Sequence, residues 1–362
     1  MFVGDFVNFH GGYVHNYSQK LMDYSSNINP IGIPESFKAA LQYNIEEFTK
    51  YPDIHYIKLR KAIGEYLAVE DINFIVPGNG AIELLYKAIK QSGKSRLISL
   101  RPTFSEYARA AIQCGIEYIA IDAFDSEYQN VDIEKVLDEA NRDSAVIICN
   151  PNNPTGTLIH KKKLLHLAEG LKTKGALLIV DEAFMEFTLD YPSNSMLDKL
   201  DQFDNLLIVK AATKFFGMPG IRLGYALSHN LKLINKMRES LEPWNVNTAA
   251  VIAGCSMLKD SDYILSSRAW ITSERENMYK GLNLINGIKA YPSAANFHLI
   301  KLLKEDIDAW QLKEKLLERN ILIRTPEGFD GLDGKYVRLA VKQKETNMIL
   351  FEELKNILCN NG

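Results

Sequence analysis

Short apolar runs alternate with helix-periodic segments between Asn73 and Ser228, and this alternation limits the possible folds more than any other feature of the chain. Each run has the length of a buried strand and is rich in β-branched residues or leucine. Runs of this kind with helices between them predict an α/β fold, in which a mostly parallel sheet carries helices on both faces. Such sheets bind ligands at the carboxyl ends of their strands, so functional residues are expected in the loops that follow. The runs are Phe74–Val76, Arg96–Leu100, Ile116–Ile121, Ala145–Cys149, Ala176–Val180 and Asn205–Val209.

The chain changes character after Tyr225. Long helices are predicted at Leu231–Ser240 and Trp270–Ile285, and the second is expected to bridge to another domain. The segments that follow predict a smaller α+β domain, with a strand at Ala290–Ile300, a helix at Leu312–Glu318 and a strand at Tyr336–Val341.

A chain of 362 residues is long enough for two or three domains, and we expect three parts. These are an N-terminal arm at residues 1–40, a large domain at residues 41–245, and a small C-terminal domain at residues 246–362 that the arm completes. The net charge of −3, from 42 basic and 45 acidic side chains, does not point to a nucleic-acid or membrane partner.

The four cysteines are scattered, without a CxxC pair or the spacing of metal ligands. We therefore expect a reduced compartment and no metal site. The segment Met1–Asp5 lacks the basic stretch that precedes the apolar core of an export signal, and no apolar run is long enough to span a bilayer. These features predict a cytoplasmic protein.

Lys214 is the first candidate for chemistry. It follows the apolar run Asn205–Val209 and precedes two aromatic residues and Pro219-Gly220. A lysine in a partly apolar setting loses its proton more readily and can form a Schiff base with a carbonyl group. The alternative is a solvated loop lysine, and the short segment alone does not decide between the two.

Asp181 directly follows another apolar run, Ala176–Val180. A carboxylate at the end of a buried strand is costly unless it is paired. It could cap the N-terminus of a helix, or it could pair with the protonated pyridine nitrogen of a cofactor and so keep the ring an electron sink.

Two loops complete the pattern. Asn150–Gly156 contains two prolines with Asn and Gly, and forms either just a rigid turn or a turn that offers Asn153 to a cofactor oxygen. Pro77–Ala81 lies between a strand and an amphipathic helix, where small residues allow backbone N–H groups to approach a phosphate.

These motifs together resemble the fold-type-I pyridoxal-phosphate (PLP) enzymes, which have the three-layer aspartate-aminotransferase fold. Within that group the chain resembles the histidinol-phosphate aminotransferase branch and is most similar to threonine-phosphate decarboxylases, from His10-Gly-Gly12 to Tyr336-Val-Arg338. The motifs that share the order and spacing of the group are Gly78-Asn-Gly80, Asn150–Gly156, Asp181-Glu-Ala-Phe184, Thr213-Lys214 and Pro219–Tyr225.

The resemblance implies a role for each motif around the cofactor ring. Lys214 would hold PLP as a Schiff base, and Asp181 would pair with the pyridine nitrogen. Asn153 would contact the phenolic oxygen, and Phe104 would stack on the ring. Tyr51 would reach the cofactor phosphate from the other subunit of a homodimer. The remaining phosphate ligands would be the N–H groups of Gly80 and Ala81, Thr213 and Arg222.

The same resemblance implies a small phosphorylated amino acid or amine as the substrate. Arg338 would bind its carboxylate and Arg324 its phosphate, because the planar guanidinium pairs with both groups through two hydrogen bonds. Taken singly, each arginine could be a surface residue. His10 and Asn29, in motifs of the arm, are also expected to bind the substrate.

The chain departs from the aminotransferase pattern at three places. Phe184 stands where aminotransferases carry tyrosine, whereas the decarboxylases also have phenylalanine there. Ala211 replaces a phosphate-binding hydroxyl residue, and Ala81-Ile82 replaces an acidic and hydroxylated pair. We therefore expect the phosphate site to depend more on backbone groups and on Arg222.

Four features favour decarboxylation of L-threonine O-3-phosphate: His10-Gly-Gly12, Asn27–Gly32, Phe184 and Glu242–Asn247. The alternative is amino-group transfer from histidinol phosphate to 2-oxoglutarate, because both reactions begin alike and none of the four features dictates which bond breaks. A non-catalytic PLP-fold binding protein would require a missing catalytic group or an added DNA-binding domain, and the sequence has neither feature.

Overall fold

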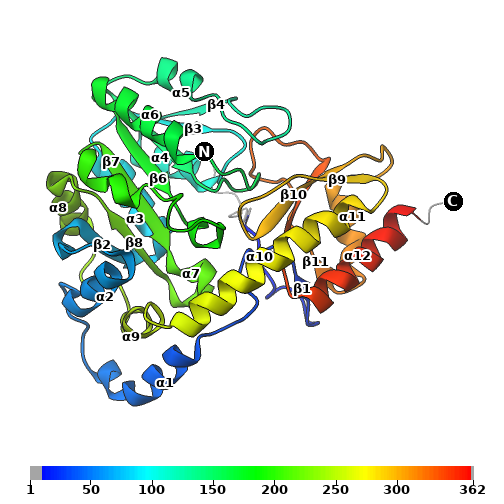
Figure 1. Ribbon diagram of the computed structural model, residues 1–362, viewed down its shortest axis with the longest axis horizontal. Helices are drawn as coiled ribbons and strands as arrows, with labels where there is room; N and C mark the ends of the chain where they lie inside the picture. The colour runs from blue at the N-terminus through cyan, green and yellow to red at the C-terminus, as the bar shows by residue number, and fades with distance from the viewer. Residues whose placement is uncertain (1–9, 360–362) are drawn as a thin grey trace.

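A seven-stranded sheet of order β2-β8-β7-β6-β5-β3-β4 forms the centre of the computed structural model, which describes residues 10–359 (Figure 1). The first nine residues of the expected arm, with Met1–Asp5, and the last three of the expected C-terminal domain lie outside the described residues. Strands β3 to β7 pair in parallel, whereas β8 is antiparallel to both of its neighbours. The expected α/β fold with a mostly parallel sheet is confirmed. The strands are β2 (Ile75–Asn79), β3 (Arg96–Leu100), β4 (Glu117–Ile121), β5 (Ser144–Cys149), β6 (Leu177–Asp181), β7 (Leu206–Ala211) and β8 (Leu223–Leu227).

All six apolar runs of the sequence form strands of this sheet. Strands β5, β6 and β7 are buried at every position, which explains why they are apolar throughout rather than alternating. Strand β8 reverses because residues 212–222, with only the short helix α7 (Ala212–Phe215) and one 3-10 turn, are too few for the crossover that a parallel strand needs.

Helices cover both faces of the sheet (Figure 1). Alternate strand residues point to opposite faces, so that Leu207 packs against one layer and Ile208 against the other. No helix in residues 10–359 combines the length and the apolar character needed to cross a bilayer. One layer contains α3 (Gly80–Gln91), α4 (Glu106–Cys114) and α8 (Leu231–Ser240); the other contains α2 (Ile57–Leu67), α5 (Ile133–Glu139) and α6 (Lys161–Thr173), with α9 (Thr248–Met257) against α2.

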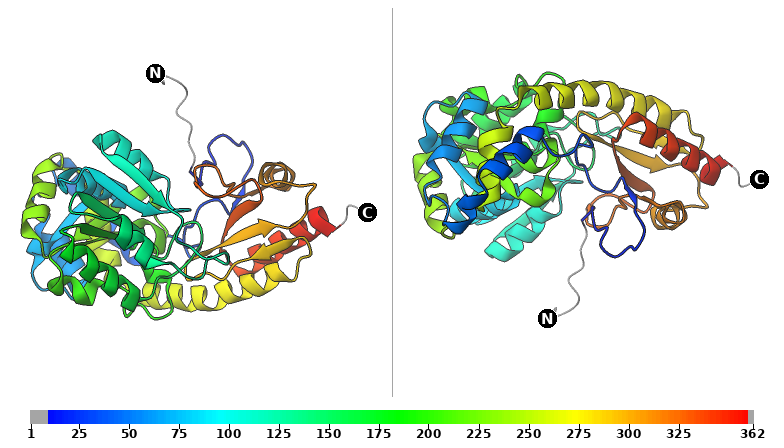
Figure 2. Two further views of the ribbon diagram at one scale, coloured as in Figure 1. Left: turned by 90° about the horizontal axis from the view of Figure 1, so that it is seen from above. Right: turned by 90° about the horizontal axis from the view of Figure 1, so that it is seen from below.

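A small domain with an antiparallel sheet of order β12-β10-β9 follows, as expected. The long helix α10 (Ser261–Asn283) runs from the large sheet to this domain (Figures 1 and 2). Near the N-terminus, β1 (Met22–Asp23) pairs in parallel with β11 (Ile321–Leu322), and α1 (Glu35–Tyr43) then leads to the large domain. The other elements of the small domain are β9 (Ile288–Ala290), β10 (Phe297–Leu302), α11 (Ala309–Leu317), β12 (Tyr336–Ala340) and α12 (Lys344–Cys359).

Two expectations for this region were wrong in detail. The segment Ala290–Ile300 is not one strand but parts of two, because Pro292 interrupts it and the chain returns so that Ile300 pairs with Ala290. The bridging helix begins at Ser261 rather than at Trp270. Asp260 caps its N-terminus by accepting a hydrogen bond from the N–H of Tyr263.

Candidate active site

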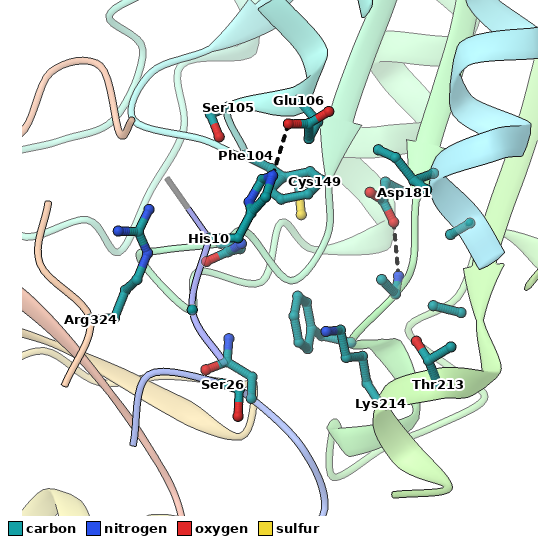
Figure 3. A pocket seen from close by; sticks show the side chains of 18 of the residues that line it. His10, Ser26, Phe104, Ser105, Glu106, Cys149, Asp181, Thr213, Lys214 and Arg324 are labelled. Atoms are coloured by element: carbon teal, nitrogen blue, oxygen red, sulfur yellow. Dashed lines mark hydrogen bonds and ion pairs between the residues drawn. The ribbon is translucent and has the colours of Figure 1, made fainter. Parts of the chain in front are cut away.

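A cavity of about 320 Å³ opens at the carboxyl ends of β5, β6 and β7, between the large sheet and the small domain (Figure 3). Residues from three distant parts of the chain form its wall: the N-terminal segment, the loops of the large sheet and the small domain. This position agrees with the rule for open α/β sheets. The predicted site residues that line the cavity are His10, Ala81, Phe104, Asn153, Asp181, Thr213, Lys214, Arg222, Arg324 and Arg338.

Lys214 lies on α7, directly after β7, and its side chain is partly buried. Burial, reinforced by the positive charges of Arg338 and Arg222, lowers the pKa of Lys214 to about 8. Its backbone is held in place, because the N–H of Asn29 donates to the Lys214 carbonyl oxygen at 3.2 Å. Near physiological pH, a lysine with this pKa supplies a far larger fraction of neutral, nucleophilic amine than an ordinary lysine does.

Asp181 is the last residue of β6 and is only 3% exposed. Its Oδ2 accepts from the hydroxyl of Tyr107 at 2.7 Å, and its Oδ1 accepts from the N–H of Ala183 at 3.0 Å. Burial raises the pKa of this carboxyl to about 6. The carboxylate caps no helix and forms no ion pair with any residue in the described range. It is therefore a buried acid that faces the cavity without a cation.

The start of α3 and Arg222 form an anion site. Gly80 has φ +80°, and a Cβ at this position would lie 2.4 Å from Nη2 of Arg222, so only glycine lets the guanidinium approach the helix start. Within residues 10–359 Arg222 makes no ion pair, and it donates to the carbonyl oxygen of Pro219 at 3.4 Å. Ala81 and Thr213 line the adjoining wall. Backbone N–H groups, a hydroxyl and a cation together suit a phosphate.

Asn153 and Arg338 are joined across the cavity. Arg338 Nη1 donates to Oδ1 of Asn153 at 2.5 Å, and its Nη2 donates to the carbonyl oxygen of Ser25 at 2.6 Å. With Oδ1 engaged in this way, the amide Nδ2 is the atom of Asn153 that can donate to a ligand oxygen.

Arg324 and Arg338 lie on one wall of the cavity, and both are buried, with 6% of each residue exposed. Neither forms an ion pair with an acid in the part of the chain that the structure describes. The ring of Phe329 packs against both guanidinium groups, with its centroid 4.8 Å from Arg324 Cζ and 5.8 Å from Arg338 Cζ. Burial lowers the pKa of Arg324 to about 10; burial and the charge of Arg324 lower that of Arg338 to about 9. Two buried cations that make no ion pair, in one enclosed wall, favour an anionic ligand, although the charges of Glu327 and Asp23 act on them from a distance.

Three predicted residues are not part of the cavity wall. Gly80 lies beside it, against Arg222. The side chain of Asn29 is directed elsewhere, since Nδ2 donates to the Phe215 carbonyl oxygen and to Ser267 Oγ, both at 2.7 Å. Tyr51 is 79% exposed and stacks on Trp244, with ring centroids 4.5 Å apart.

Sequence reasoning missed other residues of the wall. Asn27 lines the cavity in place of Asn29; it is 3% exposed, and its Oδ1 has no hydrogen-bond partner in the described structure. Both asparagines belong to one motif, and nothing in the spacing shows which of them faces the cavity. Glu106, two residues after the predicted Phe104, also lines the wall.

The family model for class I and II aminotransferases matches residues 19–354 of the chain. The chain belongs to this family. It is 38% identical to a protein of Caldanaerobacter subterraneus subsp. tengcongensis with the provisional name threonine-phosphate decarboxylase, over 96% of this chain and 93% of the relative. It is 32% identical to the threonine-phosphate decarboxylase of Salmonella typhimurium, with 94% and 92% covered. The crystal structure of the histidinol-phosphate aminotransferase from Clostridium acetobutylicum is 37% identical in sequence and has a TM-score of 0.88. The match covers 93% of this chain and 99% of that one.

PLP is the cofactor of this class I and II aminotransferase fold, and the cavity has groups that fit it. The site at Gly80 and Arg222 suits its phosphate, and the buried, unpaired Asp181 suits the cation on its ring nitrogen. Phe184 lies at the wall in a T-shaped contact with Phe297, at a centroid distance of 5.1 Å, and offers no hydroxyl to the phenolic oxygen. The chain is therefore a PLP-dependent enzyme.

An ion cluster behind the cavity supports β7, the strand that leads to Lys214. Lys210 is fully buried and lies 2.9 Å from Glu182 Oε2 and 3.2 Å from Glu186 Oε1. Ser195 Oγ donates to Glu182 Oε2 at 2.7 Å, and the N–H of Met196 donates to Glu182 Oε1 at 3.0 Å. The two carboxylates raise the pKa of Lys210 well above its usual value, against the effect of burial. The end of β7 is thus tied to the loop that follows Asp181.

Proposed function

We propose that this enzyme decarboxylates L-threonine O-3-phosphate. The pair of buried arginines carries the proposal, because Arg324 and Arg338 provide two cations without acidic partners on one wall of the cavity. Threonine phosphate has two anionic groups, a phosphate and a carboxylate, to match them within one substrate. Amino-group transfer would fill the same site in turn with histidinol phosphate, which has one anionic group, and with glutamate. The phenylalanine at position 184 and the match to two threonine-phosphate decarboxylases, one of them provisionally named, support the same conclusion.

Each group of the wall has a defined task in this reaction. PLP, when bound, accepts the electron pair of the bond that breaks at the substrate Cα. Arg324 would hold the phosphate, and Arg338 would bind the carboxylate and so fix the rotation of the substrate about Cα, which decides the bond that breaks. Asp181 keeps a proton on the ring nitrogen. Lys214, protonated by the proton that the substrate ammonium group gives up, would return that proton to Cα after carbon dioxide leaves.

Amino-group transfer from histidinol phosphate is the alternative, and the match to the Clostridium acetobutylicum structure favours it. The same residues would serve, with Lys214 removing the Cα proton. Two parallel assays separate the reactions: threonine phosphate without a keto acid, and histidinol phosphate with 2-oxoglutarate. Turnover that requires 2-oxoglutarate would establish the alternative.

We further propose a homodimer in which Tyr51 of each subunit reaches the cofactor phosphate of the other. Support comes from a group of exposed apolar side chains around α1, which protrudes from one corner of the molecule (Figure 1). A protein free in solution seldom exposes so many large apolar residues in neighbouring segments. The exposed residues are Tyr43, Ile45, Phe48, Tyr51, Ile54, Ile57 and Trp244.

We also propose that the enzyme works in the cytoplasm. All four cysteines are free, and Cys149 lines the cofactor cavity as a buried thiol whose pKa burial raises. Free thiols persist in a reducing compartment.

A further inference from the structure

Glu106 holds the ring of His10 at the mouth of the cavity (Figure 3). We propose that Glu106 is a positioning residue, which fixes the tautomer and the direction of His10 and thereby sets the affinity for the phosphorylated substrate. The effect on substrate rests on the proposed function and on the expected contact of His10 with the substrate. The effect on His10 itself depends on neither.

The carboxylate of Glu106 accepts hydrogen bonds from three different segments. His10 Nε2 lies 2.9 Å from Oε1, and Arg109 Nη1 lies 3.4 Å from the same oxygen. The hydroxyl of Tyr86, on α3, donates to Oε2 at 2.7 Å. Glu106 is 8% exposed and is the first residue of α4, where the helix dipole favours a negative charge. The N-terminal segment is thus attached to a carboxylate that α3 and α4 hold rigidly.

The charge on Glu106 decides which nitrogen of His10 carries a proton. The hydrogen bond from His10, followed by that from Tyr86, lowers the pKa of Glu106 to about 2, so the side chain is ionised in the working range. An ionised carboxylate only accepts, and Nε2 must therefore be protonated. A substrate contact of His10 is then made through Nδ1, which donates to an anionic substrate oxygen only when the ring is doubly protonated; Glu106 accepts from Nε2–H in that form as well.

The direction of the ring matters because of its neighbours. The centroid of His10 lies 6.0 Å from that of Phe104, the residue expected to stack on the cofactor, and Arg324 lines the same cavity. His10 thus lies beside the residue expected to stack on the cofactor, in the same cavity as Arg324 (Figure 3). Without Glu106 the ring could rotate or exchange tautomers. Its contact with the substrate would then be weaker, whereas the reaction at Cα would be little affected.

Nitrogen NMR of the PLP-loaded enzyme, with ¹⁵N-labelled histidine, tests the effect on His10 directly. The His10 signals are assigned by their loss in His10→Ala. In the wild type we expect a protonated Nε2. In Glu106→Gln we expect a mixture of tautomers, because an amide can either accept from the ring or donate to it. Tyr86→Phe, which leaves Oε1 unchanged, should alter these signals much less. Unchanged His10 signals in Glu106→Gln would overturn the proposal.

Kinetics on the same variants test the effect on substrate. Glu106→Gln and His10→Ala should each lower kcat/KM for the phosphorylated substrate by about tenfold to a hundredfold, mainly through KM. The double variant should lose no more than His10→Ala, since Glu106 acts through that ring. Additive losses would show that Glu106 acts independently and would contradict the proposal. If neither phosphorylated compound is turned over, the proposed function fails, and the NMR result still decides the role of Glu106.

Discussion

Arg324 and Arg338 are paired through their backbones. The N–H of Arg338 donates to the carbonyl oxygen of Arg324 at 2.9 Å, and the N–H of Arg324 donates to that of Arg338 at 3.3 Å. The bridge joins β12 to the loop after β11, so the small domain fixes the separation of the two backbones, and the ring of Phe329 packs against both guanidinium groups. Because the spacing is built into the backbone, the two arginines can select a ligand by the distance between its anionic groups.

Replacement of the arginines should separate their roles. Arg324→Ala should weaken binding of a phosphorylated substrate about a hundredfold or more, since an unpaired charge in a closed site costs about 2–5 kcal/mol. Arg338→Ala should lower kcat for threonine phosphate more than it lowers affinity, because the carboxylate loses its alignment. Steady-state kinetics check both. Arg319→Ala, at an exposed site of the same domain, is the control and should have little effect. If neither variant changes the handling of any phosphorylated amine, the substrate assignment is wrong.

The lowered pKa of Lys214 predicts how the apoenzyme takes up its cofactor with changing pH. Only the neutral amine attacks the aldehyde of PLP, so the rate of covalent attachment should rise with pH and level off above about 8, not above 10.5. Stopped-flow absorbance measures this rate. Lys214→Ala should remain folded but should not retain PLP after borohydride reduction. Covalent PLP in that variant would disprove the assignment.

The cluster around Lys210 predicts a large effect on stability. Lys210→Met leaves Glu182 and Glu186 buried without a cation, and the free energy of unfolding should fall by about 3–5 kcal/mol. Urea denaturation of the apoenzyme measures the change. Lys172→Met removes an exposed pair with Asp204 and should change the same quantity by less than about 1 kcal/mol. Equal effects of the two substitutions would show that the buried cluster adds nothing to the fold.

The shared active site predicts a specific pattern of complementation. Sedimentation should give twice the chain mass of 41.0 kDa. In a heterodimer of a Lys214→Ala chain and a Tyr51→Ala chain, one site receives both changes and the other receives neither if Tyr51 acts across the interface. Such a heterodimer should regain about half of the wild-type activity, although each parent is impaired. A fully active monomer, or a heterodimer no better than its parents, would contradict the arrangement.

Much of the site could be predicted from sequence because it lies at the ends of neighbouring strands. Asn153, Asp181 and Lys214 follow apolar runs that any parallel sheet brings to one edge, so their convergence needed no knowledge of the packing. Asn27 and Asn29 lie on an irregular segment instead. Without a helix or strand period, only the tertiary structure shows that Asn27 faces the cavity, while Asn29 supports the turn after Lys214.

Contacts between polar side chains that are far apart in the chain could not be predicted from the sequence either. The contact between His10 and Glu106 joins residues 96 positions apart, and neither motif specifies the other as its partner. The contacts of Lys210 could have been predicted. Lys210 lies near the end of one buried strand, and Glu182 and Glu186 follow the neighbouring strand, so the sequence could have indicated a buried ion pair. The prediction of a single strand at Ala290–Ile300 was wrong because it followed the apolar composition of the segment and gave too little weight to Pro292, which interrupts the strand.

Release of labelled carbon dioxide tests the proposed reaction most directly. The PLP-loaded enzyme is incubated with threonine phosphate carrying ¹³C in its carboxyl group, without any keto acid, and followed by ¹³C NMR. The account predicts that the label leaves as carbon dioxide and bicarbonate, in step with the formation of aminopropanol phosphate. If the label stays in the carboxyl group, and the amino group moves only when 2-oxoglutarate is added, the enzyme is an aminotransferase and the proposed decarboxylation is wrong.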